Sequence, residues 1–202
     1  MNAKPLFLHA VETFLSSPLM TGLCLTVPED DVDSVKALTK GLSDKMILVV
    51  AGGRERQDSV RNGFKALPAC DLVVVHDGVR PLVTTEVIER TIRGITDSAE
   101  FGGCIAGLPV KETTKRADAD GIIRETIDRS GLWSVQTPQA FRREIFQRAV
   151  QKAEEDHFLG TDEAMLVERI GERVKMVLGS PMNIKVTTPE DLQIAEAFLR
   201  IR

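Results

Sequence analysis

Short apolar segments alternate along this chain with longer segments of helical spacing, and this alternation constrains the fold more than any other feature. The segments expected to form strands are Leu23–Val27, Met46–Ala51, Leu72–His76, Cys104–Leu108 and Val174–Leu178. The segments expected to form helices are Pro5–Phe14, Val32–Leu42, Asp58–Leu67, Thr85–Ile95, Phe141–Glu154, Asp162–Ile170 and Pro189–Ile201. Because strands separated by single helices form right-handed βαβ units, the alternation predicts an α/β fold with a mostly parallel sheet.

The alternation is interrupted between Val110 and Gln136. This stretch is rich in charged side chains and shows no long helical pattern, and the turn-forming sequence DADG lies near its middle. Because so charged a stretch is poorly suited to a core, we expect residues 110–136 to leave the domain as a hairpin arm. A chain of 202 residues with 43% hydrophobic side chains is otherwise expected to form one domain, over residues 1–202.

Composition argues against several classes of partner. The net charge of −4 gives no reason to expect nucleic acid, and the longest apolar runs, such as Met46–Ala51, are too short to span a membrane. The cysteines Cys24, Cys70 and Cys104 are widely spaced and lack a CxxC pair, which indicates free thiols in a reducing cytoplasm. Neither the cysteines nor the histidines show the spacing of metal ligands, so no protein-held metal site is expected.

Charged residues follow the strand expected at Leu72–His76. Ligands bind at the carboxyl ends of strands in an open α/β sheet, so Asp77 and Arg80 are candidates for a ligand site. A simple turn is the alternative, because aspartate is a common turn residue.

A second candidate site follows the strand expected at Met46–Ala51, in the sequence AGGRERQDSV. The paired glycines Gly52 and Gly53 permit close approach to the backbone, so that a flat ring could lie against it. A tight turn followed by a helix N-cap at Asp58 or Ser59 is the alternative.

Lys185 is a third candidate, because it lies between two apolar residues and must either extend to solvent or point into a charged pocket. The sequence offers no nucleophile and base in motif spacing. The candidates are instead the cations Arg80, Arg129 and Lys185 with one carboxylate, Asp77. Cations bind phosphates and a carboxylate binds hydroxyls or a metal ion. Phosphoryl or nucleotidyl transfer, which needs little beyond positioning and charge neutralisation, fits this set.

Six ordered segments of the chain carry a resemblance to a known family. They are GGRERQDSV, HDGVRP, PVKETTKR, IDRSGLWSVQTPQAF, TDEA and NIKVTTPEDL. In order and approximate spacing they resemble the 2-C-methyl-D-erythritol 4-phosphate cytidylyltransferases of non-mevalonate isoprenoid biosynthesis, over nearly the whole chain from Pro5 onward. The resemblance implies a Rossmann-like twisted sheet with helices on both faces, and a β-arm that clasps a second subunit to form a homodimer.

The resemblance also implies a reaction and its participants. The 4-phosphate of methylerythritol phosphate attacks the α-phosphorus of CTP and releases pyrophosphate, with Mg²⁺ as cofactor. The residues implied to contact the nucleotide are Gly53, Arg54, Ser59, Asp77 and Gly78. Those implied to bind the sugar phosphate are Arg80, Thr113, Thr137 and Thr161. The residues implied to act in catalysis are Lys185, Arg129 and Asp77, with Thr113 and Arg129 reaching in from the arm of the other subunit.

Two departures from the family pattern bear on activity. Gly78 and Val79 stand where the family more often has two alanines, which matters little where contacts run through the backbone. The family also begins with a strand, a glycine-rich loop with an arginine, and the lysine of a PKQ triplet, which together grip the triphosphate. This sequence begins downstream of them and contains no Gly-x-Gly or P-loop pattern. We therefore expect a start codon placed too late or a rearranged sheet, and negligible turnover by these 202 residues alone.

The sequence leaves two alternatives open. The related ribitol 5-phosphate (pentitol-phosphate) cytidylyltransferases share the fold and several motifs, although TDEA and RSGLWSVQTPQ favour the methylerythritol enzyme. A non-catalytic dimeric remnant is the other, and a remnant should bind CTP weakly or not at all.

Overall fold

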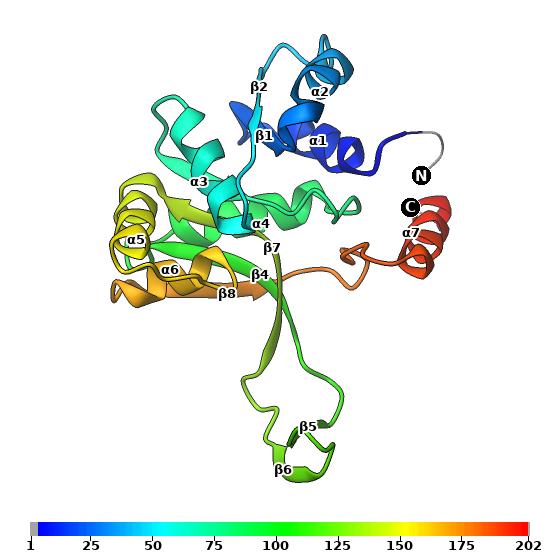
Figure 1. Ribbon diagram of the computed structural model, residues 1–202, viewed down its shortest axis with the longest axis vertical. Helices are drawn as coiled ribbons and strands as arrows, with labels where there is room; N and C mark the ends of the chain where they lie inside the picture. The colour runs from blue at the N-terminus through cyan, green and yellow to red at the C-terminus, as the bar shows by residue number, and fades with distance from the viewer. Residues whose placement is uncertain (1–3, 202) are drawn as a thin grey trace.

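The computed structural model describes residues 4–201 (Figure 1). Its helices are α1 (Leu6–Ser16), the 3₁₀ helix η1 (Glu29–Asp31), α2 (Val32–Thr39), α3 (Arg56–Ala66), α4 (Thr85–Thr96), α5 (Arg143–Glu155), α6 (Glu163–Arg169) and α7 (Pro189–Ile201). Its strands are β1 (Gly22–Val27), β2 (Met46–Ala51), β3 (Leu72–Val75), β4 (Gly103–Pro109), β5 (Thr114–Ala117), β6 (Ile123–Ile127), β7 (Trp133–Arg142) and β8 (Val174–Leu178). Every helix and strand expected from the alternation is present, with ends that coincide with the expected ones or differ from them by a few residues. None of the described helices is long and apolar enough to cross a membrane.

Local sequence explains where several helices begin. The side chains of Thr84 and Asp162 each accept a hydrogen bond from the backbone N–H of the third helical residue, which caps α4 and α6. Helix α3 carries a capping box in which Glu55 and Asp58 satisfy each other's backbone N–H groups. Because this box uses Asp58 inside the helix, α3 begins at Arg56, ahead of the start expected at Asp58.

The core strands form two sheets. β1 and β2 pair in parallel, and the larger sheet has the order β3-β7-β4-β8. Within it β4 and β8 are parallel, but β7 runs antiparallel to both β3 and β4. The α/β fold is therefore confirmed, whereas the expectation of a mostly parallel sheet holds for β1–β2 and β4–β8 and is wrong for the pairs that β7 makes.

Strand β7 is the element that the alternation did not predict. It contains Pro138, and proline is rare in a central strand because it cannot donate a hydrogen bond to the ladder. Here the ladder with β4 is interrupted between Ile105 and Gly107, and Pro138 lies within that interruption. On the other side β3 ends opposite Gln139, before the proline is reached. The proline is thus placed where neither neighbour needs its missing N–H, and β7 begins at Trp133, inside the stretch expected to form the arm.

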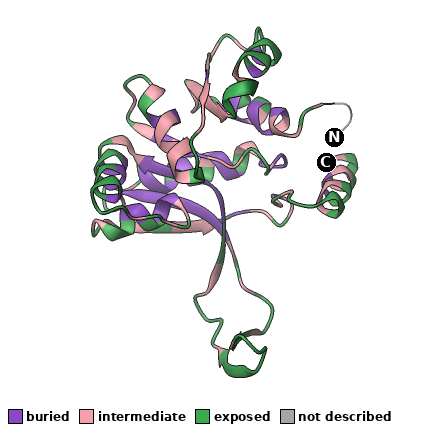
Figure 2. Cartoon of the chain, in the orientation of Figure 1, coloured by how far each residue is buried: buried purple, intermediate pink, exposed green. Residues whose placement is uncertain are grey.

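The larger sheet is covered by helices on both faces (Figure 2). Ile105 and Phe141 pack with buried side chains of α5 and α6 in one hydrophobic cluster. Their neighbours Cys104 and Ala140 pack with α1 and α4 in a second cluster. Successive residues of a strand point to opposite faces, so both faces of β4 and β7 are buried, as in a central layer between two layers of helices.

The two sheets are not joined by strand pairing within residues 4–201. β1 pairs only with β2 along the described chain, and β3 pairs only with β7. A cavity of about 260 Å³ lies between β1 and β3 and is lined by side chains of both strands and of α1 and α3. Every residue of β1 is only partly buried, in keeping with this open edge. The described strands thus form two separate sheets and not one continuous sheet.

The stretch between β4 and β7 extends away from the rest of the molecule (Figure 1). Its strands β5 and β6 pair as an antiparallel hairpin, with Gly121 at a φ of +79° in the turn. The Asp118 carboxylate accepts hydrogen bonds from the backbone N–H groups of Asp120 and Ile122, which fixes the turn. The expected hairpin is therefore present, and most of its side chains are exposed.

Candidate functional site

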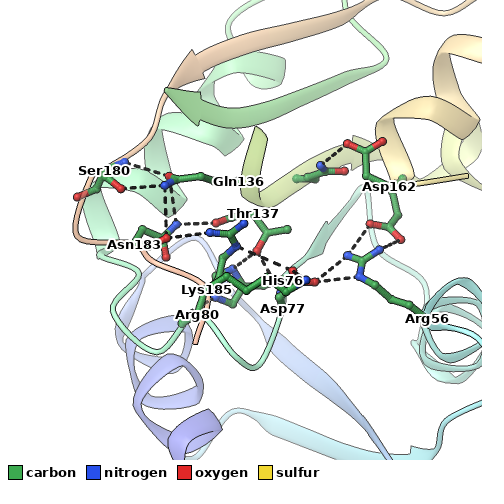
Figure 3. A network of polar contacts seen from close by, with 12 residues as sticks. Arg56, His76, Asp77, Arg80, Gln136, Thr137, Asp162, Ser180, Asn183 and Lys185 are labelled. Atoms are coloured by element: carbon green, nitrogen blue, oxygen red, sulfur yellow. Dashed lines mark hydrogen bonds and ion pairs between the residues drawn. The ribbon is translucent and has the colours of Figure 1, made fainter. Parts of the chain in front are cut away.

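Strand β7 carries three buried polar side chains near the point where β3 ends. Gln136 donates a hydrogen bond of 2.9 Å to a backbone carbonyl of the loop after β8. The hydroxyl of Thr137 accepts one of 3.1 Å from the backbone N–H of Asp77, after β3. Gln139 donates one of 2.8 Å to Asp162, the cap of α6. One strand thereby fixes three separate loops around a single place (Figure 3).

The loop after β8 is also bonded directly to the loop after β3. The N–H of Val186 donates to the carbonyl of Val79 at 2.8 Å, and the Arg80 guanidinium donates to the carbonyl of Asn183 at 2.9 Å. These bonds place Lys185 beside Asp77.

Asp77 is the centre of a charged cluster, with its side chain 12% exposed. Its Oδ1 atom accepts a hydrogen bond of 2.9 Å from Nε of Arg56. Its Oδ2 atom lies 3.5 Å from Nζ of Lys185 and 3.9 Å from Nε of Arg80. Three predicted site residues from two distant segments, Asp77, Arg80 and Lys185, are thus brought together, and Thr137 supports them from behind.

The surroundings of Asp77 keep its carboxylate charged. Burial opposes ionisation, but the nearby Arg56, Lys185 and Arg80 side chains overcome this and hold the pKa of Asp77 below its ordinary value. Burial lowers the pKa of Arg80, which Asp77 partly offsets and Arg56 reinforces. The site therefore presents an ionised carboxylate among cations at neutral pH.

Arg56 links Asp77 to a second carboxylate, Glu163 at the start of α6. The guanidinium donates two hydrogen bonds to Glu163, of 2.6 Å and 2.9 Å. The Glu163 side chain is 2% exposed. Burial raises the pKa of Glu163, against the opposing effect of its bonds and charge attraction to Arg56.

His76 lies directly behind the cluster and is held at both ring nitrogens. Nδ1 lies 3.0 Å from the Thr137 hydroxyl, and Nε2 lies 3.0 Å from the backbone carbonyl of Arg80. Because a carbonyl can only accept, Nε2 carries the proton, and the Thr137 hydroxyl then donates to Nδ1. The ring also packs against Phe14, with centroids 5.0 Å apart. Burial lowers the pKa of His76 to about 4, although the Arg80 carbonyl and the charge of Asp77 act in the other direction.

The cluster is chemically suited to a ligand that carries both hydroxyl and phosphate groups. The three cations Arg56, Arg80 and Lys185 outnumber the two carboxylates by one positive charge. Lys185 is the most exposed of the three at 46%, so a phosphate arriving from solvent meets it directly. The Asp77 carboxylate accepts hydrogen bonds from hydroxyls. No group of three or more histidine, cysteine or acidic side chains placed to hold a metal ion occurs in residues 4–201.

The glycine pair after β2 forms a compact turn against α3. The Ser59 hydroxyl accepts a hydrogen bond of 3.0 Å from the N–H of Gly53. A Cβ atom at position 53 would lie 2.2 Å from Cβ of Asp58, so the close packing against α3 requires glycine there. The tight turn of the alternative interpretation is therefore present, whereas the expected N-cap at Asp58 or Ser59 is wrong, because Glu55 is the N-cap residue of α3. Gly53 and Arg54 are exposed beside them, as is Gly78 in the loop after β3.

Besides the residues of the glycine turn, three more predicted site residues lie outside the cluster. Thr161 is exposed next to the cap of α6, and its hydroxyl contacts the sulfur of Met165 at 3.7 Å. Thr113, just before β5, and Arg129, just after β6, are exposed on opposite sides of the hairpin arm. Within one subunit, the two arm residues do not form part of the cluster around Asp77.

Sequence reasoning missed Arg56, His76, Glu163 and the supporting glutamines of β7. Arg56 and Glu163 lie inside the motifs GGRERQDSV and TDEA, so the signal was present. Their pairing joins positions 107 residues apart, and spacing along the chain gives no indication of it.

Comparison with known proteins finds one family that the whole chain resembles. The family model described as IspD, 2-C-methyl-D-erythritol 4-phosphate cytidylyltransferase, matches residues 1–201. The enzyme of that name from Syntrophus aciditrophicus is 46% identical over 203 residues, covering 99% of this chain and 86% of the relative. The one from Geobacter metallireducens is 40% identical and covers 99% and 87%. The crystal structure of 4-diphosphocytidyl-2C-methyl-D-erythritol synthase from Anaerococcus prevotii superposes with a TM-score of 0.90 at 31% identity, covering 99% of this chain and 88% of the other.

Proposed function

This chain belongs to the 2-C-methyl-D-erythritol 4-phosphate cytidylyltransferase family, and on that premise we propose that the cluster around Asp77 is its substrate site. The protein is a nucleotidyltransferase that forms CDP-methylerythritol and pyrophosphate from CTP and 2-C-methyl-D-erythritol 4-phosphate. The observation that carries the site assignment is the contact of 3.5 Å between Asp77 and Lys185. Two motifs far apart in sequence converge in it, at the carboxyl end of a sheet strand where ligands bind.

Asp77 and Lys185 have complementary roles in this proposal. Asp77, with Gly78 beside it, accepts hydrogen bonds from the ribose and acceptor hydroxyls, while Arg80 neutralises charge behind it. Lys185 holds the 4-phosphate of the acceptor and aims its oxygen at the α-phosphorus of CTP. Positioning and charge neutralisation of this kind supply most of the catalysis in such transfers.

The turn at Gly53 is the proposed place of the cytosine ring. Gly53 is exposed and has no side chain to cover its backbone, so a flat ring has access to that backbone on the side away from α3. The Ser59 hydroxyl accepts from the Gly53 N–H and donates to the Glu55 carbonyl at 3.3 Å, and we propose that this hydrogen turns from the long Glu55 contact to the base. Arg54 lies next to this turn and Thr161 lies near the acceptor side of the cluster.

Magnesium belongs with the nucleotide in this proposal. Asp77 is the carboxylate nearest to the proposed reaction, and it is surrounded by Arg56, Arg80 and Lys185, which repel a dication. The described cluster therefore does not fit a protein-ligated magnesium site. Mg²⁺ commonly binds mainly through substrate phosphates and water, so we assign it to CTP and route no step through it.

We propose a homodimer in which each arm completes the site of the other subunit. Thr113 and Arg129 are exposed on the arm, and Ile122 and Ile123 near its tip are 56% and 60% exposed. Exposed apolar side chains on a projecting hairpin favour burial against another subunit. Sedimentation of the protein at a range of concentrations measures the dimer directly.

We place the protein in the cytoplasm. Its three cysteines all lie in the described part of the chain and are unpaired, as expected where thiols stay reduced.

A single-turnover assay tests the proposed function. Protein in excess over CTP is incubated with either methylerythritol phosphate or ribitol 5-phosphate, and pyrophosphate release is followed, so that even slow transfer is measured. We expect release with methylerythritol phosphate and none above background with the pentitol phosphate, which none of the relatives described above is named for. The matched control is Lys185→Ala. A wild-type rate equal to that of this variant would favour the non-catalytic remnant, and equal rates with both acceptors would refute the acceptor assignment.

A further inference from the structure

Arg56 bridges two carboxylates that differ sharply in their access to solvent and to ligands. Glu163 is 2% exposed, whereas the Asp77 side chain is 12% exposed and faces the other cations of the cluster. Arg56 contacts Glu163 with two hydrogen bonds and Asp77 through Nε. Glu163 therefore holds Arg56 from the buried side, and Arg56 in turn holds Asp77 from the exposed side.

The buried end of this bridge is anchored on both sides. Gln139 of β7 accepts a hydrogen bond of 3.2 Å from the N–H of Ala164 and donates to the cap of α6, so Glu163 lies on a fixed helix start. Gln57, next to Arg56 on α3, donates to the carbonyl of Phe158 and accepts from the N–H of Gly160, at 2.9 Å each. The elements that carry Arg56 and Glu163 are therefore tied to each other independently of the ion pair.

The contact with Arg56 makes the two carboxylate oxygens of Asp77 unequal. Oδ1 is occupied by Arg56 at 2.9 Å, a normal charge-assisted hydrogen bond. Oδ2 faces Lys185 and Arg80 at 3.5 Å and 3.9 Å, which are longer than such bonds. A fixed Oδ1 therefore leaves Oδ2 as the atom directed at a ligand hydroxyl.

We propose that Arg56 and Glu163 form a positioning pair that orients the Asp77 carboxylate for substrate, an inference that rests on the function proposed above. Neither side chain is assigned a contact with substrate. The planar guanidinium suits this task, because it binds one carboxylate with two parallel hydrogen bonds and still directs Nε to another. Lysine keeps the charge but not this geometry.

The sign of one pKa change tests the pair without any turnover. The carboxyl carbon of Asp77 is titrated by NMR in the wild-type protein and in Glu163→Gln. If Glu163 only adds negative charge to the cluster, its removal lowers the pKa of Asp77. If Glu163 holds Arg56 in place, its removal releases Arg56 from Asp77 and the pKa of Asp77 rises. We expect the rise, and a fall or an unchanged value overturns the proposal.

A double-mutant cycle gives a second, kinetic test. We expect Glu163→Gln and Arg56→Lys each to lower kcat/KM for methylerythritol phosphate, obtained from single-turnover rates as above, by roughly 10- to 100-fold, as misplaced catalytic groups do. In the Asp77→Asn background, Glu163→Gln should lower it by less than about twofold further, because a residue that acts through Asp77 has nothing left to position. A full multiplicative loss in the double variant would refute the pair.

The control is an ion pair on the same helix that does not reach Asp77. Arg61 of α3 binds Glu154 of α5 at 3.0 Å, and Glu154→Gln makes the same chemical change there. We expect this variant to keep both the wild-type kcat/KM and the wild-type pKa of Asp77. If the wild-type protein transfers no CMP to methylerythritol phosphate, the proposed function fails, whereas the NMR titration still decides whether Glu163 positions Arg56.

Discussion

Acidification should destabilise the folded protein through His76. The ring donates from Nε2 to the Arg80 carbonyl and accepts at Nδ1 from the Thr137 hydroxyl, and both bonds require the neutral imidazole. Protonation adds a hydrogen at Nδ1, where the Thr137 hydroxyl already points. The Thr137 hydroxyl in turn accepts from the N–H of Asp77, so the loop that carries the site depends on the protonation state of His76.

The magnitude follows from the pKa in the two states. In the unfolded chain His76 titrates near 6.5, and in the folded protein burial lowers its pKa to about 4. Between these values the unfolded state binds more protons, so stability is complete above pH 6.5 and is lost as the pH falls toward 4. The full difference corresponds to about 3 kcal/mol. Because the residue as a whole is only partly buried, we expect the loss by pH 5 to be about 1 to 2 kcal/mol.

The assay is urea denaturation of the wild-type protein and of His76→Gln between pH 7.5 and pH 4.5. Glutamine places a carbonyl oxygen and an amide N–H within reach of the same partners but does not titrate. Many carboxylates also titrate in this range, so the measured quantity is the difference in unfolding free energy between the two proteins at each pH. We expect the wild type to be the more stable at pH 7.5 and its advantage to shrink steadily below pH 6.5. If the difference in unfolding free energy stays constant with pH, the ring of His76 is not held neutral by its two hydrogen bonds in the folded protein.

Three further outcomes are expected from the same structure. Asp77→Asn should lower kcat/KM by roughly 100-fold while costing only about 1 kcal/mol in unfolding free energy, because asparagine keeps an oxygen for its partners. A large loss of unfolding free energy with turnover retained under folding conditions would make Asp77 a structural turn residue. Mixing inactive Arg129→Ala and Lys185→Ala subunits should restore part of the activity if the arm is shared, since one site of a mixed dimer is wild type; no recovery despite demonstrated subunit exchange would exclude shared sites. A thiol reagent should label Cys24 well before Cys104, because Cys24 lines the cavity beside β1 whereas Cys104 is fully buried and burial raises its pKa to about 11; mass spectrometry that finds Cys104 labelled first would contradict this order.

The fold was predictable from sequence wherever one physical rule determined an element. β2 has the bounds expected from its continuous apolar run. β8 also has the expected bounds, where the exposed Lys175 alternates with the partly buried Val174 and Met176 on an edge strand. The candidate site was predictable to the extent that charges followed such a strand, as Asp77 and Arg80 follow β3. The partners of Asp77 were not predictable in the same way. Arg56 and Glu163 meet only because α3 and α6 approach the same end of the sheet, which spacing along the chain does not reveal.

Strand β7 shows why the main error of the sequence analysis fell on the strand that builds the site. β7 runs antiparallel to β3 and β4, so its first half lies at their carboxyl ends and its second half lies in the core. The first half therefore carries Gln136 and Thr137 for the loops of the site, and the second half carries Gln139, which binds the cap of α6, followed by the fully buried Ala140 and Phe141. A search for one hydrophobic pattern along the whole strand does not detect β7, because its first half contacts the polar loops of the site and its second half is buried in the core. The antiparallel direction of β7, which makes its sequence pattern mixed, also puts its polar residues at the edge of the sheet where ligands bind.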